Sequence, residues 1–260
     1  AAPVFEALSG TLDTPKKAWI LKVSNYQRLR DVNGMKRTAQ AWADANGYHE
    51  EPVLMLAELA LRERRADDAL RILNKGLSGL LADNARIQLA KLQLLLDSGN
   101  SNDAGQFYDQ IKTSITDEKV NEGIQGRLLL LNKDFQQAIP KLANFYKEFP
   151  SSRSAVFYAA ALKGNRDLDS ASKHLEGHIA SFGHDLRARN ALADVYLGLD
   201  TEKAIAQYNE IIKLQPNSVI ALNNLAWLTM EKGQLDKAIT YSKLAYERAP
   251  QIASVVDTYA

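Results

Sequence analysis

The stretch VIALNNLAWLTMEKGQLDKAITYSKLAYERAP, from Val219 to Pro250, decides the fold. It contains two apolar segments with helical periodicity, and it ends at a proline, which cannot continue a helix. Each segment carries a small residue, Ala226 in the first and Ala238 in the second, twelve positions later. Because two helices approach closely only where their side chains are small, the stretch predicts an antiparallel helix pair that crosses at these alanines.

Similar units precede this stretch along most of the chain. Alanines recur every 30 to 35 residues, at Ala39, Ala69, Ala104, Ala138, Ala171, Ala204 and Ala238. Another small residue lies twelve positions before four of them, at Ala57, Gly126, Ala159 and Ala226. Before Ala104 the gap is 14 residues, from Ala90, and before Ala204 it is 11, from Ala193. A period near 34 predicts a solenoid of stacked helix pairs, each in contact with its neighbours.

These residues resemble the tetratricopeptide repeat. In residues 219–250 the pattern is carried by Leu222, Leu225, Ala226, Ala238, Ala245 and Pro250, and the preceding copy supplies Leu192, Ala193, Tyr196, Ala204, Tyr208 and Pro216. The resemblance covers roughly residues 16 to 260. It implies an all-α, right-handed superhelical solenoid of about seven antiparallel helix pairs, plus a truncated eighth helix.

The period places the helix pairs at about 16–46, 51–80, 83–114, 117–148, 152–181, 186–214 and 219–248. Turn signals lie at Gly99-Asn100-Ser101, Asn132-Lys133-Asp134 and Gly164-Asn165. Residues 252–260 align with the start of the preceding unit, so we expect the start of a further repeat there. Val255, Val256 and Tyr259 should pack on the second helix of the seventh pair. We therefore expect residues 1–260 to form one solenoid that is a fragment of a longer protein.

Composition and charge point to no particular polyanionic partner. The chain has 32 Lys and Arg residues against 31 Asp and Glu, which gives no general attraction to nucleic acid or anionic lipid. No apolar run approaches the ~18 residues that span a bilayer. Cysteine is absent, which excludes disulfides and cysteine-ligated metals. The densest basic stretch, Arg62 to Arg65, closes a first helix, where cations favour the helix dipole; a partner-binding patch is the alternative.

The sequence predicts no catalytic residue, metal site or cofactor. His174 and His178 have a spacing that can bind a metal, but no further ligand at a matching spacing follows, so we expect packed or hydrogen-bonded histidines. His49-Glu50-Glu51 departs from the HExxH zinc pattern because Pro52 and Val53 follow. Glycine-rich phosphate motifs and the GxSxG nucleophile motif are also missing.

Surface residues are therefore the candidates for function. The resemblance implies that first helices line a concave groove that binds a peptide or a partner helix. Counting along each first helix from its small residue places ten residues in this groove: Arg28, Glu58, Lys91, Arg127, Arg153, Arg187, Asn190, Asp194, Asn223 and Trp227. Arg and Asn side chains can bind carboxylates and backbone amides, and Trp227 can anchor a partner or pack under an eighth repeat. A solvated face without a ligand is the alternative.

A finer resemblance concerns the last repeats. Residues Asn223 to Leu228, Leu244 to Pro250, and Val256-Asp257-Thr258 are similar to the C-terminal repeats of bacterial lipoproteins that accompany exopolysaccharide export and the PEP-CTERM/exosortase system. In that family an apolar residue and then Gly-Trp follow the Asp-Thr, whereas Tyr259 and Ala260 follow here. The resemblance implies a periplasmic scaffold tethered to the outer membrane; a cytoplasmic location is the alternative.

Two functions remain open at this point. The first is a non-catalytic scaffold that binds a protein or peptide partner through the groove, in a complex of the bacterial envelope. The second is a region that regulates or positions a catalytic domain, such as a glycosyltransferase or protease, elsewhere in a larger protein. In both cases the expected partner is a protein rather than a nucleic acid. End-to-end self-association through residues 252–260 is a further expectation.

Overall fold

Side-chain oxygens cap most helices of the chain at their N-termini. Asp117, Ser151 and Ser218, for example, accept hydrogen bonds from backbone N–H groups of the helical turn that follows each of them. These N–H groups have no partner inside a helix, so each cap stabilises its helix by ~0.5–2 kcal/mol. The structure is a computed structural model that describes residues 16–45 and 49–259. Within these ranges it contains fifteen α-helices, one 3₁₀ turn and no strand.

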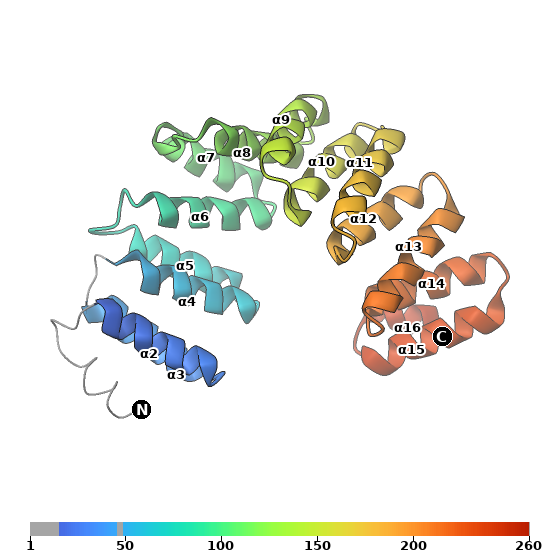
Figure 1. Ribbon diagram of the computed structural model, residues 1–260, viewed down its shortest axis with the longest axis horizontal. Coiled ribbons are helices and arrows are strands. Elements are labelled where there is room, and N and C mark those ends of the chain that lie inside the picture. Colours follow the sequence, from blue (N-terminus) through green and yellow to red (C-terminus); the bar gives the residue numbers. More distant parts are fainter. Residues whose placement is uncertain (1–15, 46–48, 260) are drawn as a thin grey trace. The chain divides into compact units, whose positions relative to one another are not determined.

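The chain divides into two compact units, residues 1–116 and residues 117–260. Unit 1 contains three helix pairs, shown from blue to green in Figure 1. They are α2 (Lys16–Arg28) with α3 (Val32–Ala45), α4 (Glu50–Arg62) with α5 (Ala66–Gly76), and α6 (Ala85–Asp97) with α7 (Ser101–Ile111). The 3₁₀ turn Lys112–Ser114 follows α7. The Trp19 and Trp42 rings stack between α2 and α3, with 6.3 Å between ring centroids.

Unit 2 contains four helix pairs and a final short helix (Figure 1). The pairs are α8 (Glu118–Leu131) with α9 (Phe135–Glu148), α10 (Ser152–Gly164) with α11 (Leu168–Ser181), α12 (Leu186–Tyr196) with α13 (Thr201–Leu214), and α14 (Val219–Glu231) with α15 (Leu235–Arg248). The last helix is α16 (Ala253–Tyr259). We call the first member of each pair a first helix and the other a second helix.

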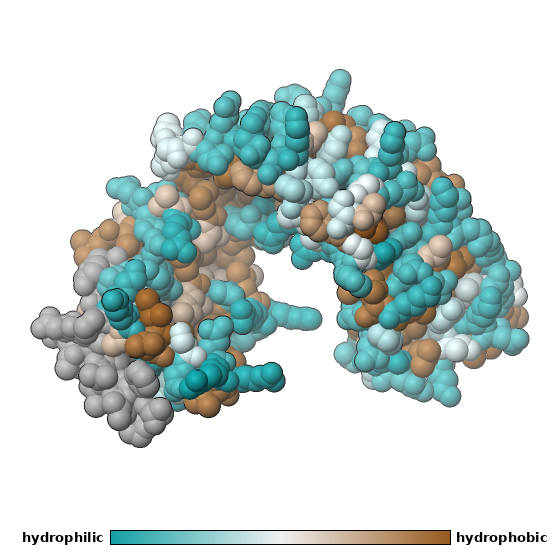
Figure 2. All heavy atoms as spheres, viewed as in Figure 1, coloured by the Kyte–Doolittle hydropathy of each residue, from teal (hydrophilic) through white to brown (hydrophobic). Residues whose placement is uncertain are grey.

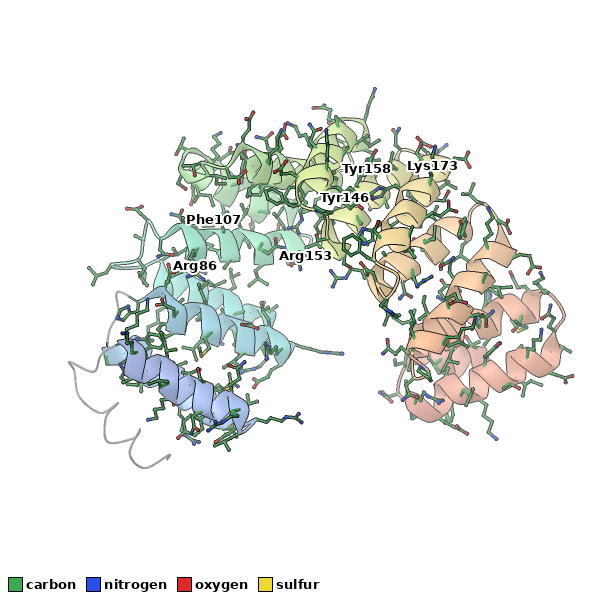
Figure 3. All side chains as sticks on the ribbon, in the orientation of Figure 1. Arg86, Phe107, Tyr146, Arg153, Tyr158 and Lys173 are labelled. Atoms are coloured by element: carbon green, nitrogen blue, oxygen red, sulfur yellow. The ribbon has the colours of Figure 1, made fainter. Side chains whose placement is uncertain are left out.

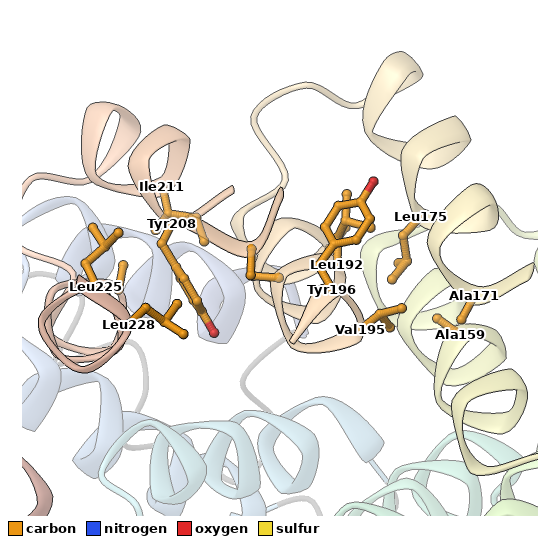
Figure 4. Packing of buried hydrophobic residues seen from close by; sticks show 14 of the residues in the cluster. Ala159, Ala171, Leu175, Leu192, Val195, Tyr196, Tyr208, Ile211, Leu225 and Leu228 are labelled. Atoms are coloured by element: carbon orange, nitrogen blue, oxygen red, sulfur yellow. The ribbon is translucent and has the colours of Figure 1, made fainter. Parts of the chain in front are cut away.

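Small residues occupy most of the helix crossings, as the sequence predicts. All seven recurring alanines are buried, six of them completely. At the crossing of α8 and α9, a Cβ atom added to Gly126 would lie 2.8 Å from Cγ of Leu142, too close for any real contact. In unit 2, Ala171 and Ala204 belong to a continuous apolar cluster that runs through successive helix pairs (Figure 4). Leu175, Leu192, Ile211 and Leu225 are among its fully buried members.

A residue in the left-handed conformation joins the two helices of most pairs. The residues concerned have φ between 55° and 77° and are Arg30, Arg64, Gly99, Lys133, Arg166 and Gly233. The turn after α12 is different, because both Leu199 and Asp200 donate their N–H groups to the carbonyl of Tyr196. Helix α12 ends three residues after Ala193, whereas α14 ends five residues after Ala226, and the connection to α13 has four residues instead of three. Together these differences give the 11-residue gap between Ala193 and Ala204.

The predicted turn at Gly164-Asn165 is placed slightly too early. Gly164 is the last residue of α10, and Arg166 takes the left-handed conformation. Gly164 serves packing instead, because a Cβ atom there would lie 2.4 Å from the ring of Phe135.

Helix α16 packs on the last helix pair through one of the predicted residues. Val255 is buried against Leu222 of α14 and Ala245 of α15, which confirms its expected contact with the second helix. Val256 is partly exposed instead, since it lies on the other side of this short helix. The predicted contact of the Tyr259 side chain lies outside what the structure describes.

Candidate partner-binding surface

Three first helices of unit 2 place predicted residues in matching positions. Asn190 and Asn223 are 33 residues apart, as are Asp194 and Trp227, so each pair occupies equivalent positions in successive repeats. Lys163 of α10 forms an ion pair with Asp194, so α10 and α12 are neighbours on this side. Figure 3 shows Arg153 at the start of α10, where its side chain is exposed. We call this surface the first-helix face; its predicted members are Arg153, Arg187, Asn190, Asp194, Asn223 and Trp227.

Two asparagines of this face have amide oxygens without a hydrogen-bond donor. Asn190 donates through Nδ2 to the carbonyl of Leu186, at 2.7 Å. Its Oδ1 atom and the Oδ1 atom of Asn223 are buried, and neither has a donor in the described part of the chain. A buried acceptor that stays unpaired costs ~1–3 kcal/mol. Each oxygen can accept a partner's N–H group only when its side chain turns outward, and that hydrogen bond would remove the cost.

Helix α14 adds an exposed apolar stripe to the first-helix face. Ile220, Trp227 and Met230 are 66%, 44% and 46% exposed, and their spacing of seven and three residues puts them on one side of the helix. Asn223 lies between Ile220 and Trp227 on the same side. Figure 2 shows such hydrophobic patches among the hydrophilic side chains of the viewed side of unit 2. An exposed tryptophan flanked by aliphatic side chains is a suitable anchor for a partner.

Sequence reasoning missed Ile220 and Met230. The signal that could have found them is the helical spacing of both residues from Trp227. Asn224, the neighbour of Asn223, has a different role, since its Nδ2 donates to the hydroxyl of Tyr208 at 2.8 Å and ties α14 to α13. Burial raises the pKa of Tyr208, the hydrogen bond from Asn224 opposes the rise, and the charge of Asp194 adds to it.

Arg127 is in the expected position but is buried. Only 7% of its surface is exposed, and its guanidinium lies 4.4 Å from the centroid of the Phe157 ring of α10. A cation held over an aromatic face in this way stabilises the contact between α8 and α10 by ~0.5–2 kcal/mol. Arg127 thus contributes to packing between first helices, and its side chain is not open to a partner.

Lys91 lies on a different side of its helix from the one predicted. Its Nζ atom lies 3.9 Å from the centroid of the Phe107 ring of α7, the second helix of the same pair, and burial lowers its pKa. The prediction counted from Ala90, whereas the fully buried Leu92 lies twelve residues before Ala104 and takes the crossing position. The register is therefore shifted by two residues, which turns Lys91 away from the first-helix side.

The other two predicted groove residues belong to unit 1. Arg28, at the end of α2, donates a hydrogen bond to the side chain of Asn25 at 3.3 Å. Glu58 of α4 forms an exposed ion pair with Arg62, one turn later, at 2.6 Å. Both are exposed and paired within their own helices, so they add nothing to the first-helix face of unit 2.

The two histidines of α11 are packed and hydrogen-bonded, as expected. His178 is buried; its Nε2–H donates to Asp185 at 2.9 Å, and its Nδ1 accepts from the hydroxyl of Tyr146 at 3.0 Å. His174 donates to the carbonyl of Ala155 at 3.1 Å, and its ring meets Tyr146 edge-on. Asp185 also caps α12 by accepting from the backbone N–H of Ala188. The histidines therefore hold α9, α10, α11 and the start of α12 together.

This network does not have the geometry of a nucleophile and its base. Ser152 donates its hydroxyl proton to Asp185 at 2.9 Å, so the serine contacts the carboxylate rather than the histidine. Burial alone would raise the pKa of Asp185, but the hydrogen bonds from Ala188, His178 and Ser152 lower it below its ordinary value. The carboxylate is held charged between donors, which suits a structural cap. Within the described residues, no group of three or more His, Asp or Glu side chains could hold a metal ion.

Two models of known protein families match helix pairs of unit 2. One tetratricopeptide repeat model matches residues 191–218 and another matches residues 207–240. Residues 191–240 are tetratricopeptide repeats, and the fold of the chain is that of a tetratricopeptide-repeat solenoid. The chain is similar in fold to a tetratricopeptide repeat (TPR) protein from Parabacteroides merdae ATCC 43184, with a TM-score of 0.69 at 14% sequence identity. The match covers 94% of this chain and 96% of that protein chain. A chain of the Cut9–Hcn1 hetero-tetramer of the APC/C is also similar in fold, with a TM-score of 0.70 at 14% sequence identity. That match covers 99% of this chain and 54% of the other.

A curated relative extends the TPR match to sequence. The chain is 26% identical over 169 residues to the TPR repeat-containing protein PA4667 of Pseudomonas aeruginosa (strain PAO1). The match covers 63% of this chain and 28% of that protein, so this chain corresponds to less than a third of its relative. No helix in the described ranges is long and apolar enough to cross a bilayer. The TPR fold indicates a scaffold for protein–protein interaction.

Proposed function

We propose that this TPR protein is a non-catalytic scaffold that binds an extended segment of a partner protein across the first-helix face of unit 2. The observation that carries the proposal is the pair of buried, donor-free amide oxygens of Asn190 and Asn223, in equivalent positions of successive repeats. Backbone N–H groups of an extended segment recur along its length and fit acceptors that recur along the helices. Binding removes the cost of the two unpaired oxygens.

The remaining residues of the face complete the recognition. An apolar side chain of the partner packs on Trp227, between Ile220 and Met230, where all three side chains are exposed. Arg153 and Arg187, at equivalent positions of α10 and α12, attract carboxylates of the partner. The amides thus align the partner's backbone, while the apolar stripe and the arginines select its side chains.

A library of displayed random peptides, panned on the purified chain, tests this function. Peptides that are enriched are synthesised, and their affinities are measured by calorimetry against single-alanine variants. Asn190→Ala, Asn223→Ala and Trp227→Ala should each weaken binding by about ten-fold or more, the size expected for a hot-spot residue. Lys173→Ala on α11 (Figure 3), an exposed second-helix residue, is the matched control and should leave affinity unchanged. Enriched peptides that depend on Lys173 and not on the three first-helix residues would refute the proposal.

For the full-length protein we propose a periplasmic scaffold tethered to the outer membrane, in a complex of exopolysaccharide export. The support is the resemblance of residues 223–228, 244–250 and 256–258 to lipoproteins of that system. Fractionation of cells that express the full-length protein tests the location, together with its sensitivity to protease added after the outer membrane is opened. Recovery in the cytoplasmic fraction would overturn this part and leave the binding proposal intact.

A further inference from the structure

A groove runs between α3 and α5 in unit 1, with α4 as its floor. Its larger part, of about 810 Å³, is lined by residues such as Arg37 of α3, Leu56 of α4 and Lys75 of α5. It continues into a smaller part, of about 460 Å³, which shares Leu56, Ile72 and Lys75 and ends at Leu80. Because α3 and α5 are second helices, this groove lies on the second-helix side of unit 1 and is separate from the first-helix face of unit 2.

The larger part of the groove has a surplus of positive charge. Its five basic side chains are Lys36, Arg37, Arg65, Arg71 and Lys75, against the carboxylates of Asp44 and Asp68. Asp68 is shared by Arg65 and Arg71, and the nearby Glu63 is shared by Lys36 and Arg65. Arg37 and Lys75 have no ion-pair partner among the residues that the structure describes. Arg65, the last residue of the basic stretch from Arg62 to Arg65, therefore belongs to a larger basic surface.

The smaller part of the groove has a mixed lining, with the polar side chains of Gln40, Asp44, His49, Lys75 and Ser78 beside an aliphatic floor. Leu56 and Ile72 are partly buried along its floor, and Val53 and Leu81 are buried at its far end. Leu80 stands beside them with 82% of its surface exposed, the largest exposure of any large apolar side chain in the described residues. An exposed leucine next to an aliphatic floor provides apolar area that a ligand can cover. The groove thus combines a cluster of cations with an aliphatic floor.

We propose that this groove binds an acidic, amphipathic segment of a partner protein. Carboxylates of the segment pair with Arg37 and Lys75 and compete for the shared Arg65, while its aliphatic side chains cover Leu80 and the floor formed by Leu56 and Ile72. Charge complementarity attracts the segment, and the apolar contact selects among acidic sequences. The ligand is a peptide because the cations alternate with Glu63 and Asp68, which would repel the unbroken negative charge of a nucleic acid.

The probe for this site is a fluorescein-labelled peptide of four Glu-Glu-Leu triplets, measured by fluorescence anisotropy on the whole chain. A peptide of four Gln-Gln-Leu triplets is the control for charge. The acidic probe should bind at least about ten-fold more tightly than the neutral one, and less tightly as NaCl rises from about 50 to about 500 mM. Equal affinity of the two peptides would overturn the proposal.

Charge-reversal variants locate the site. The double variant Arg37→Glu/Lys75→Glu should weaken binding of the acidic probe by at least about ten-fold. The control Lys17→Glu/Lys173→Glu makes the same change in net charge at exposed positions outside the groove and should have little effect. Equal losses in both variants would mean attraction by overall charge and would refute the site.

Four further variants test the apolar contact, the fold and the independence of this site from the first-helix face. Leu80→Ser should weaken the acidic probe, whereas Leu235→Ser, at a leucine with 60% exposure in unit 2, should not. If circular dichroism shows that the charge reversals unfold the chain, Arg37→Gln/Lys75→Gln supplies the same test. Trp227→Ala should leave probe binding intact, so failure of this proposal and failure of the first-helix face are distinguishable.

Discussion

Two glycines inside helices of unit 2 should respond differently to the same substitution. A Cβ atom at Gly126 would lie 2.8 Å and 2.9 Å from Cγ and Cδ2 of Leu142, whose side chain is fully buried and cannot move aside. A Cβ atom at Gly177, inside α11, would meet nothing within 4 Å. Replacing glycine by alanine within a helix gains ~0.8–1.0 kcal/mol of helix propensity at both sites. Only Gly126→Ala also carries the cost of overpacking, ~1–3 kcal/mol.

The free energy of unfolding should therefore rise by about 1 kcal/mol in Gly177→Ala and fall or stay level in Gly126→Ala. The difference between the variants isolates the crossing, because the propensity gain is common to both and cancels. Urea unfolding followed by far-ultraviolet circular dichroism gives the midpoints, and hydrogen exchange of α8 and α9 assigns the change to the crossing. If both variants were stabilised equally, the close contact of α8 with α9 at Gly126 would not exist.

Three further predictions concern a turn residue and buried polar groups. Arg64 has a left-handed conformation, which costs an arginine ~1–2 kcal/mol. Arg64→Gly removes this cost but makes the unfolded chain more flexible, so it should stabilise unit 1 by ~0.5–1 kcal/mol in urea unfolding. Arg64→Ala should stay within ~0.5 kcal/mol of neutral in the same assay. His178→Ala should cost ~2–4 kcal/mol, because it leaves a cavity and frees two hydrogen-bond partners, whereas Tyr146→Phe should cost ~1 kcal/mol by the same assay. Burial lowers the pKa of His174 below 6.5, against the hydrogen bond to Ala155, so its contribution to stability is complete above pH 6.5 and is lost as the pH falls. In His174→Phe, melting temperatures measured from about pH 7 down to about pH 5 should therefore depend less on pH than in the parent protein.

The fold was predictable because the residues that repeat along the sequence are those whose size is limited by helix packing. Ala138 and Ala204 are fully buried at helix crossings, where larger side chains would separate the helices, so the period of small residues reports the period of the structure. Local rules alone would have misled, since Pro140 lies inside α9 and would interrupt an isolated helix. The buried Ala138 and Leu142 on either side of it show that tertiary packing keeps the helix continuous.

The register was less predictable where a crossing accepts a larger residue. In the third pair the small residue Ala90 is only partly buried, while Leu92 fills the crossing. A search for small residues chooses Ala90 and therefore misplaces Lys91. The turn offers a better reference, since Leu92 lies seven residues before Gly99 just as Ala226 lies seven residues before Gly233, and both glycines have positive φ.

Exposure of the predicted groove residues depends on the next first helix, whose side chains the position of the residue in its own helix does not reveal. Arg127 and Trp227 both follow the small residue of their helix, yet Arg127 is 7% exposed and Trp227 is 44% exposed. Phe157 of α10 covers Arg127, and by the alignment of the repeats the equivalent residue of α16 is Thr258, which is too short to cover Trp227. Thr258→Phe should therefore shield Trp227, lower the quenching of tryptophan fluorescence by iodide, and weaken peptides that bind the first-helix face. Trp19 and Trp42 are each only 1% exposed, so the quenching reports Trp227; unchanged quenching in Thr258→Phe would show that α16 does not control this surface.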